Sequence, residues 1–393
     1  MTLKIYKFKE LGQVITGKTP PTSQNELYGN DYPFITPSDI PTFSERYIFQ
    51  TERGLSVSGR NKMKSIILPR NSICVVCIGS TIGKICLTHE NESITNQQLN
   101  SIKVTNEKFD AMYLYYAIRN YIPKIQAVSG GTGAGKAILN KSSFEELEIE
   151  LLENKQIQNK IAKILSNYDD LIENNNKRIK ILEEMAQKIY KEWFVDFKYP
   201  GHETATFKGT ELGKIPSDWE VNNVEQIVKR LKCKNKYTQE NVLNRGNIIV
   251  IDQSTNEFLG FHNNEADFIA TPSKPLIIFG DHTCKMQIIV ENFSIGPNVI
   301  PITSEKLPIA FVYFLIDSLI ETKEYKRHWN DLISKKVIVP KEEIAECFAN
   351  LISPIMTQIS HLKNININLK QTRDMILPRL MSGEIDIEKL EIQ

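Results

Sequence analysis

The residues with the clearest chemical potential form a glycine-rich run, GGTGAGK at residues 130–136, which satisfies the GxxxxGK spacing of a phosphate-binding loop. In such loops the residue after the lysine is Ser or Thr, whose hydroxyl binds magnesium, but here it is Ala137. The run also does not sit between a clear strand and a helix of a parallel sheet. We therefore expect no nucleotide hydrolysis, and we interpret the run as a flexible loop whose backbone amides and Lys136 approach a DNA phosphate.

Other sets of catalytic residues are incomplete in this sequence. Methyl transfer to DNA would need an Asn/Asp-Pro-Pro-aromatic motif and a glycine-rich loop for the methyl donor, and the sequence has neither. A nuclease would need clustered carboxylates with a lysine at strand ends, whereas Asp39 and Glu45 lie in a proline-rich stretch. Histidines such as His89 and His328 lack the spacing of metal ligands. We expect neither catalysis nor a metal site in this chain.

Cys74 and Cys77 form a CxxC pair, but they lie in an apolar, strand-like run at residues 72–78. No second pair completes a zinc site. Free cysteine commonly behaves as a small buried hydrophobe. We therefore interpret both as buried strand thiols, and the few, unevenly spaced cysteines as typical of a reduced cytosolic chain.

Length and composition favour a multidomain protein without a membrane segment. The 393 residues suffice for two or three domains, each with its own core. No apolar run approaches the ~18 residues of a membrane span. The N-terminus lacks the apolar stretch and cleavage site of a signal peptide, so we expect a cytoplasmic protein.

The elements that position these residues occur in two copies, at an offset of about 200 residues. Each copy has two strand-like runs, a polar turn with amide side chains, and a helix rich in aromatic and aliphatic residues. The first copy comprises residues 72–78, 83–88, 96–100 and 109–116, and the second comprises residues 275–279, 285–290, 296–300 and 309–315.

Each copy is followed by a long helical pattern with an apolar seam. The seam residues are Ile157, Ile161, Ile164, Tyr168, Leu171, Leu182, Met185 and Ile189 in the first helix, and Ile344, Phe348, Leu351, Ile355, Ile359, Leu362, Leu369 and Ile376 in the second. Asparagines near the middle of each seam, at 174–176 and at 364, 366 and 368, can fix register at a cost in stability. Pro200-Gly201 is expected to stop the first helix, and Pro378, with Ser382-Gly383 beyond it, is expected to stop the second.

These patterns predict an α+β protein with two similar globular α/β domains separated by two long antiparallel coiled-coil helices. We place the first globular domain at residues 1–152 and the first long helix at 153–199. The second globular domain follows at 200–340, and the C-terminal long helix at 341–393. A helix from 154 to 196 would be roughly 60 Å long at ~1.5 Å per residue. An antiparallel pair would place the globular domains at opposite ends.

Charge is balanced overall but unevenly distributed. The net charge of +1 argues weakly against a nucleic-acid partner. Basic residues nevertheless gather in each half of the chain, where they suit two phosphate-facing surfaces. These patches comprise Arg53, Arg60, Lys62, Lys64 and Arg70 in the first half, and Lys229, Arg230, Lys232, Lys234, Lys236 and Arg245 in the second.

In combination, several segments give the chain a specific resemblance. They are LGQVITGKTP (residues 11–20), YPFITPSDI (32–40), WFVDF (193–197), LGKIPSDWE (212–220) and LPRLMSGEI (377–385). With these segments, essentially the whole chain resembles the specificity subunit of type I restriction-modification systems.

The resemblance implies a non-catalytic DNA-recognition subunit with two target-recognition domains, each of which reads half of a bipartite sequence in double-stranded DNA. It implies that the helices set the spacing and bind two modification subunits, which carry S-adenosylmethionine. Restriction subunits would add ATP- and Mg-dependent translocation and cleavage. No cofactor is expected in this chain.

Lysines and arginines would bind phosphates, and polar loop side chains would read base edges in the major groove. The candidates in the first domain are Lys18, Arg60, Lys62, Lys64, Ser80, Thr81, Lys84 and Lys136. Those in the second domain are Lys232, Lys234, Lys236, His282, Lys285, Arg327 and Lys335. A coiled-coil scaffold that binds only protein stays open as the alternative, and a free-standing enzyme is the weakest reading.

Overall fold

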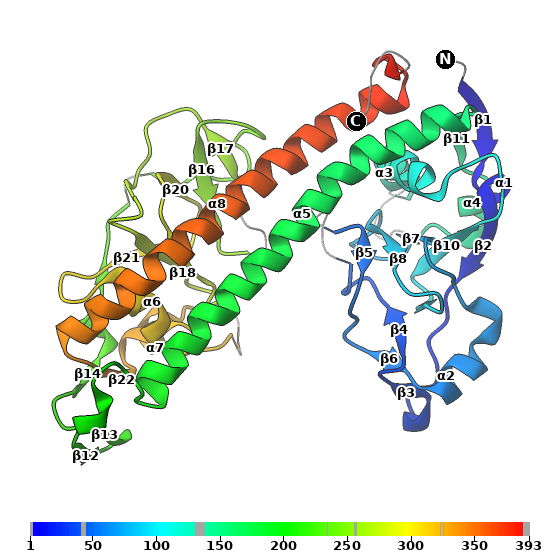
Figure 1. Cartoon of the computed structure of the whole chain (residues 1–393). Coiled ribbons are helices and arrows are strands. Elements are labelled where there is room, and N and C mark those ends of the chain that lie inside the picture. Colours follow the sequence, from blue (N-terminus) through cyan, green and yellow to red (C-terminus); the bar gives the residue numbers. More distant parts are fainter. Residues whose placement is uncertain are drawn as a thin grey trace. The chain divides into compact units, whose positions relative to one another are not determined.

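The structure is a computed structural model that describes residues 3–40, 45–129, 138–233, 235–254, 258–322, 324 and 326–387 (Figure 1). It comprises two compact units. Unit 1 holds Met1–Asn175 and Ile365–Gln393, and unit 2 holds Asn176–Asn364. The long helices α5 (Lys155–Tyr190) and α8 (Glu342–Met381) each contribute one part to each unit. The predicted domain boundaries at 152, 199 and 340 differ in kind, because they treat each long helix as a separate segment of the chain. These boundaries stay a prediction.

The main sheet of unit 1 has five strands in the order β2-β10-β7-β8-β5. Its strands are β2 (Gly12–Thr16), β10 (Leu99–Val104), β7 (Ile73–Val76), β8 (Ile85–Thr88) and β5 (Tyr47–Ile48). A smaller sheet has the order β3-β6-β4-β9, with β3 (Tyr28–Gly29), β6 (Gly54–Leu55), β4 (Tyr32–Ile35) and β9 (Ile94–Thr95). Separately, β1 (Leu3–Lys7) pairs with β11 (Glu148–Leu152), the strand that directly precedes α5.

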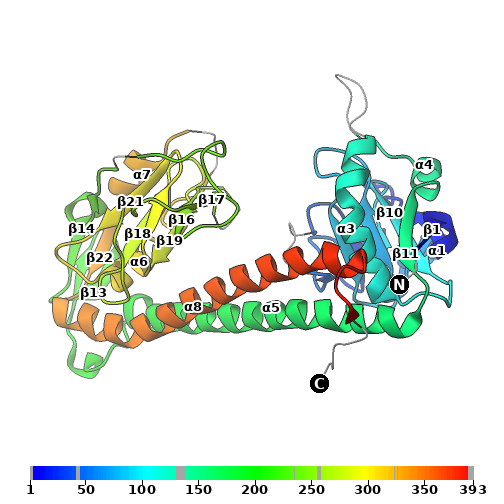
Figure 2. The ribbon, with the colours of Figure 1, turned by 90° about the horizontal axis from the view of Figure 1, so that it is seen from above.

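Helix α3 (Ala111–Ser129) covers the main sheet of unit 1 (Figure 2). Its buried Tyr113 and Leu114 share a core with Ile73 and Val75 of β7. The same core includes side chains from the start of α5 and, at Leu377 and Leu380, from the end of α8. Short helices α1 (Phe8–Leu11), α2 (Val57–Lys62) and α4 (Lys141–Glu145) lie in the connections.

Unit 2 repeats this plan with shorter elements. Its four-stranded sheet has the order β15-β21-β18-β19, with β15 (Lys229–Arg230), β21 (Val299–Thr303), β18 (Leu276–Gly280) and β19 (Met286–Ile289). A smaller sheet has the order β17-β16-β20, with β17 (Gly260–His262), β16 (Ile248–Ile251) and β20 (Phe293–Ile295). Strand β14 (Glu220–Asn223) pairs with β22 (Lys336–Val339), which directly precedes α8.

The remaining elements of unit 2 are the hairpin of β12 (Phe207–Thr210) and β13 (Gly213–Pro216), and the helices α6 (Ile309–Ile316) and α7 (Trp329–Ile333). Helix α6 is buried almost all round because it packs between the sheet and the long helices of this unit. It corresponds to α3, so the repeat predicted from the sequence is confirmed in the order and pairing of the elements.

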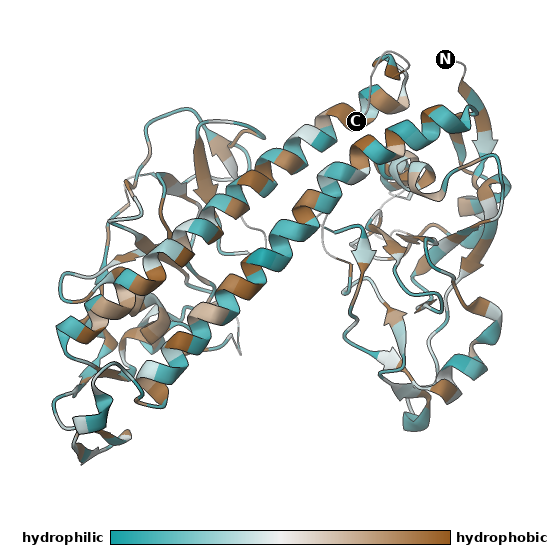
Figure 3. Cartoon of the chain, in the orientation of Figure 1, coloured by the Kyte–Doolittle hydropathy of each residue, from teal (hydrophilic) through white to brown (hydrophobic). Residues whose placement is uncertain are grey.

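Helices α5 and α8 run antiparallel within each unit, as predicted. In unit 1, Asp169 and Asn175 of α5 contact Arg373 and Asn366 of α8, respectively. In unit 2, Lys363 Nζ of α8 lies 3.2 Å from Glu183 Oε1 of α5. Figure 3 shows the alternation of polar and apolar residues along both helices.

The predicted seam is wrong at Leu171, Met185 and Leu351, whose side chains are exposed. The buried positions beside them are Ile172, Ala186 and Ile352. The cause in α5 is that charged and polar residues, Asp169 and Asn175, occupy buried seam positions. Apolar periodicity alone therefore points to neighbouring positions.

The end of α8 also differs from the prediction. Pro378 does not stop the helix, which continues to Met381. Gly383 follows with a φ of 75°, in the left-handed region that glycine adopts without strain. No helix in the described part of the chain is both long enough and apolar enough to cross a membrane.

Candidate nucleic-acid interface

Loops from separate parts of unit 1 meet at one edge of its main sheet. The strand registers place the end of β2 and the end of β7 on either side of the start of β10. Lys18 N donates to Thr95 O (2.9 Å), which joins the loop after β2 to the turn before β10. Gln98 Nε2 donates to Ile78 O (3.5 Å), which joins that turn to the β7–β8 turn. Residues 17–19, 36–40, 78–83 and 95–98 are termed the loop edge of unit 1.

The corresponding loops meet in unit 2. Asp281 N donates to Asn298 O (2.8 Å), just as Cys77 N donates to Gln98 O (2.8 Å) in unit 1. Tyr237 N donates to Ile295 O (3.1 Å) and so brings the segment after β15 to the same edge. Residues 231–233, 235–237, 252–254, 281–285 and 296–298 are termed the loop edge of unit 2. Both units thus present loops at the same place in the fold.

Gly17 lies where the loop after β2 crosses the turn before β10. A Cβ atom at this position would lie 2.2 Å from the carbonyl oxygens of Thr95 and Asn96. Because those neighbours are backbone atoms, they cannot move aside as a flexible side chain would. Only glycine lets the loop that carries Lys18 approach this closely.

Several predicted DNA-binding residues of the first domain lie at or beside the loop edge of unit 1. Lys18 and Ser80 are exposed, and Thr81 is half-buried. Lys84 is half-buried next to the β7–β8 turn, and its ammonium group donates to Ile40 O (2.7 Å) and Pro37 O (3.2 Å). The structure therefore brings together residues that are up to 66 positions apart in the sequence, from Lys18 to Lys84.

In unit 2 the predicted residues gather in the same way. Lys232 and Lys236 are exposed, and His282 and Lys285 are half-buried in the β18–β19 turn. Arg327 adjoins this edge, because its Nε lies 3.8 Å from Asp281 Oδ2 and the next residue, His328, donates its backbone N–H to Asp281 O (2.8 Å).

The other predicted residues of the first domain lie on a separate surface, beside β3 and β6. Arg60 of α2 forms an ion pair with Glu92, and this contact lowers the pKa of the Glu92 carboxyl. Lys62 Nζ donates to Gln24 Oε1 (2.5 Å), and Lys64 is exposed. Arg60 would have to exchange its carboxylate partner for a phosphate in order to bind DNA.

Lys335 is also not brought to a loop edge in the described structure. It lies between α7 and β22, and its carbonyl accepts from Val224 N (2.9 Å). Lys136 and Lys234 lie outside the described residues. The described chain resumes after Lys136 at Ile138, which forms a β-bridge with Ile78 at the loop edge of unit 1.

Polar side chains at the loop edges that sequence reasoning did not single out include Gln97, Gln98, Gln253, Thr283 and Asn298. Amide side chains carry both donors and acceptors, so they can read adenine edges in the major groove. The sequence carried a signal for Gln97, Gln98 and Asn298, since the turn at 96–100 is rich in amides and Asn298 lies in the corresponding turn at 296–300. Only the strand registers show that these turns adjoin the exposed lysines.

The described loop edges carry lysine, amide and hydroxyl side chains. Among the described residues, no group of three or more His, Cys, Asp and Glu side chains is placed to hold a metal ion. Beside the loop edge of unit 2, the Tyr237 and His262 rings stack at 4.2 Å. Burial lowers the pKa of His262, which favours a neutral ring at this position.

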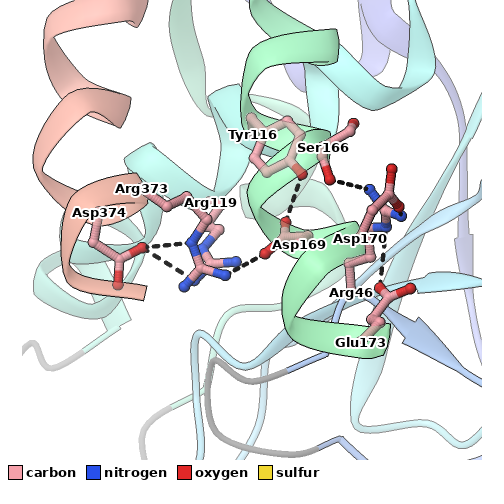
Figure 4. A network of polar contacts seen from close by, with 9 residues as sticks. All are labelled: Arg46, Tyr116, Arg119, Ser166, Asp169, Asp170, Glu173, Arg373 and Asp374. Carbon is pink, nitrogen blue, oxygen red and sulfur yellow. Dashed lines mark hydrogen bonds and ion pairs between the residues drawn. The ribbon is translucent and has the colours of Figure 1, made fainter. Parts of the chain in front are cut away.

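A network of charged side chains joins the globular part of unit 1 to both long helices (Figure 4). Tyr116 of α3 donates to Asp169 Oδ2 (2.5 Å), and the other oxygen of Asp169 contacts Arg373 of α8. Arg119 of α3 lies 3.3 Å from Asp374 of α8. The loop edge of unit 1 therefore belongs to a domain whose α3 contacts both long helices.

Arg46, which precedes β5, adds a second contact with α5. It forms an ion pair with Asp170, and its Nε lies 3.2 Å from Glu173 Oε1. Burial raises the pKa of Glu173, and the positive charge of Arg46 opposes that shift. The equivalent junction in unit 2 is aromatic, with Phe194 rings 4.8 Å from Phe311 and 5.1 Å from Phe348.

Comparison with known proteins gives consistent matches. Residues 2–184 match the family model described as the type I restriction modification DNA specificity domain. The MjaIX specificity subunit of a type I restriction enzyme from Methanocaldococcus jannaschii is 27% identical over 413 residues, covering 98% of this chain and 94% of that protein. The HindI specificity subunit from Haemophilus influenzae is 36% identical over 177 residues, covering 43% of this chain and 37% of that protein.

The fold is also similar to a solved structure. The crystal structure of the S subunit of a type I restriction-modification system from M. genitalium aligns with a TM-score of 0.58 at 16% identity, covering 97% of this chain and 96% of that one. The alignments with the MjaIX subunit and with the M. genitalium structure extend over both repeats and both long helices. The first part of the chain thus matches the type I restriction modification DNA specificity domain, and nearly the whole chain is similar to a specificity subunit of a type I restriction enzyme.

Proposed function

We propose that this chain selects the DNA sequence on which a type I restriction-modification complex acts, with each unit reading one half of a bipartite target. The observation that carries this proposal is the presence of two loop edges built on the same hydrogen-bond pattern, one in each unit. Each edge combines exposed lysine with amide and hydroxyl side chains, and the exposed lysines are Lys18 in unit 1 and Lys232 and Lys236 in unit 2. Lysines supply attachment to phosphates, and the polar side chains supply base discrimination.

Within this proposal, Lys18, Ser80 and Thr81 contact DNA from unit 1, and Lys232, Lys236 and His282 from unit 2. Arg327 and the basic residues of the α2 surface, Arg60, Lys62 and Lys64, contact flanking phosphates. The proposal also includes DNA contacts by Lys136, Lys234 and Lys335. Only their charge and their position in the sequence support these contacts.

The chain acts as a non-catalytic, cytoplasmic subunit in this proposal. Two modification subunits bring S-adenosylmethionine, and restriction subunits bring ATP and Mg. An exposed apolar pair on α5 in unit 2, Ile181 and Met185, supports docking of a modification subunit. Side chains at i and i+4 are neighbours on a helix surface, and contiguous exposed apolar surface is typical of protein–protein interaction sites.

The long helices set the spacing between the half-sites in this proposal. Removal of one heptad from each helix would shorten them by ~10 Å at ~1.5 Å per residue. The gap in the target should then shorten by about 3 base pairs, since base pairs rise ~3.4 Å along each strand. A gap of unchanged length in such a variant would refute the spacing role.

The experiment that tests the function uses the chain assembled with its modification subunits and a library of random DNA. The expected result is enrichment of one split motif, with two specified halves and a gap of fixed length. No enrichment would instead favour a scaffold that binds only protein. Methylome sequencing of cells that express the complete system would identify the same motif independently.

A further inference from the structure

Lys84 and Lys285 occupy equivalent positions in the two repeats. Lys84 O accepts from Val76 N (2.9 Å) where β7 meets β8, and Lys285 O accepts from Gly280 N (2.8 Å) where β18 meets β19. Each lysine lies directly before the second strand of its pair, β8 or β19. The turns between the paired residues differ in length, but the lysine is present at the same place in both.

The ammonium groups of both lysines bind backbone carbonyls of another loop in their own unit. Lys84 Nζ donates to Pro37 O (3.2 Å) and Ile40 O (2.7 Å). Lys285 Nζ donates to Asp252 O (3.5 Å) and Ser254 O (2.8 Å). An ammonium group has three donors, and in each lysine at least two are directed at the protein's own backbone.

The loops that the lysines bind are themselves equivalent. Each follows a strand that pairs in parallel with its neighbour, β4 with β9 and β16 with β20. Asn96 N donates to Ile35 O (3.0 Å) at the end of β4, and Gly296 N donates to Ile251 O (2.9 Å) at the end of β16. Residues 36–40 and 252–254 therefore begin at the same point of the fold.

Side chains of these loops differ between the repeats, yet the lysine contacts persist because they are made to backbone oxygens. Thr36 and Asp39 bond each other in unit 1 (Oγ1–Oδ2 2.6 Å). In unit 2, Gln253 is held by the β18–β19 turn, since Thr283 Oγ1 donates to its carbonyl (2.7 Å). A donor that binds carbonyls holds a loop whatever side chains the loop carries.

We propose that Lys84 and Lys285 are positioning residues for base recognition, which hold residues 36–40 and 252–254 in place at the two loop edges. They act on sequence discrimination through these loops and do not supply phosphate contacts. This inference rests on the proposed function, because it assumes that each loop edge reads one half of the target.

The test compares Lys84→Met and Lys285→Met in the assembled complex, with DNA libraries in which one half-site at a time is randomised. Methionine keeps the unbranched stem and removes the ammonium donors. We expect Lys84→Met to relax base preference by about 10-fold or more in one half-site only, and Lys285→Met to do so in the other, the size of a lost base contact. Each variant is thereby the control for the other.

A salt titration separates positioning from phosphate binding. Loss of a phosphate contact lowers the slope of log affinity against log salt by about 1 and weakens all sequences alike. The exposed lysines Lys18 and Lys236, changed to Met, provide matched controls for that behaviour. For Lys84→Met and Lys285→Met we expect an unchanged slope, and a slope lower by about 1 with unchanged base preference would overturn the proposal.

A second pair of variants covers the case in which methionine impairs folding. Lys84→Gln and Lys285→Gln remove the charge but keep an amide that donates to carbonyls. If the lysines position the loops, the Gln variants should retain more base discrimination than the Met variants. If the lysines attract phosphates, the Gln and Met variants should lose equal amounts of DNA affinity. If the unaltered complex selects no split motif, the proposed function fails. If it selects one and every variant selects it equally sharply, only this inference fails.

Discussion

Arg373 of α8 and Asp169 of α5 form an ion pair in which both side chains are almost completely buried, at 1% and 3% exposure. Tyr116 of α3 donates to the same carboxylate (2.5 Å). A buried pair of this kind contributes little net stability compared with apolar residues, but removal of one partner leaves a buried charge without compensation. The pair therefore selects one register of α5 against α8 in unit 1. Through Tyr116, α3 contacts the same pair.

Asp169→Asn tests this role. We expect a loss of up to about 3 to 5 kcal/mol, because Arg373 stays buried beside a neutral amide and keeps its contact with the half-exposed Asp374 (2.9 Å). The measurement is the urea midpoint of unfolding. Glu384→Gln is the control, since its pair with Arg379 (2.7 Å) is half-exposed and should contribute at most ~1 kcal/mol. Equal midpoints for the two variants would contradict a special role for the buried pair.

Sequence patterns predicted the repeat, the long helices and their antiparallel pairing because these depend on local periodicity. The register of the helices was not predictable in the same way. Asp169 and Arg373 look like surface residues in the sequence, yet they occupy the seam because each compensates the charge of the other. The partner is 204 residues away, and no local pattern contains that information.

The candidate site was predictable in part. The sequence singled out Lys84 and Lys285 by charge and by their position in the repeat. It did not indicate that their ammonium groups bind carbonyls, because that depends on parallel pairs such as Phe34 with Ile94 and Ile249 with Phe293. Parallel pairing joins strands through long connections, and its register has no hairpin turn to mark it.

The buried amide pair of unit 1 gives a second prediction. Asn175 Nδ2 donates to Asn366 Oδ1 (2.9 Å), with the side chains at the helix seam. Asn175→Leu alone should destabilise the chain by about 1 to 3 kcal/mol, because Asn366 loses this donor in a buried place. The double variant with Asn366→Leu should regain most of that loss in thermal unfolding, as expected of a polar pair that sets register. Additive losses in the double variant would show that the two amides act independently.

Glu291 in unit 2 predicts a pH dependence. Burial raises the pKa of its carboxyl, and the hydrogen bond from Asn364 Nδ2 (2.8 Å) only partly opposes that shift. A raised acid pKa means that the folded state favours the protonated form, so the stability from this group is present at low pH and lost as pH rises through the folded pKa. Glu291→Gln should thus stabilise the chain increasingly in thermal unfolding as pH rises above the ordinary carboxyl pKa of 4.5.

Glu305 in the same unit is the control for that experiment, with the opposite sign. Lys229 Nζ donates to Glu305 (2.6 Å) and lowers the pKa of its carboxyl. The stability from this group is present above the unfolded pKa and lost as pH falls, so Glu305→Gln should be slightly destabilising at neutral pH. A stabilisation by Glu291→Gln that is constant with pH would rule out titration as its cause.

The last prediction concerns Cys74 and Cys77, whose CxxC spacing resembles half of a zinc site. In the structure they lie in separate cores: Cys77 packs with Tyr113 and Cys74 with Ile35. Residues three apart on a strand point to opposite faces of the sheet, so the sulfurs cannot share a metal or form a disulfide. Burial raises the pKa of Cys77 to about 11 and suppresses its thiolate.

Iodoacetamide should therefore modify exposed Cys347 on α8 in the native chain and reach Cys74 and Cys77 only in urea, as read by mass spectrometry. Protection of these two that persists in urea, and is removed by a chelator, would instead establish a metal site.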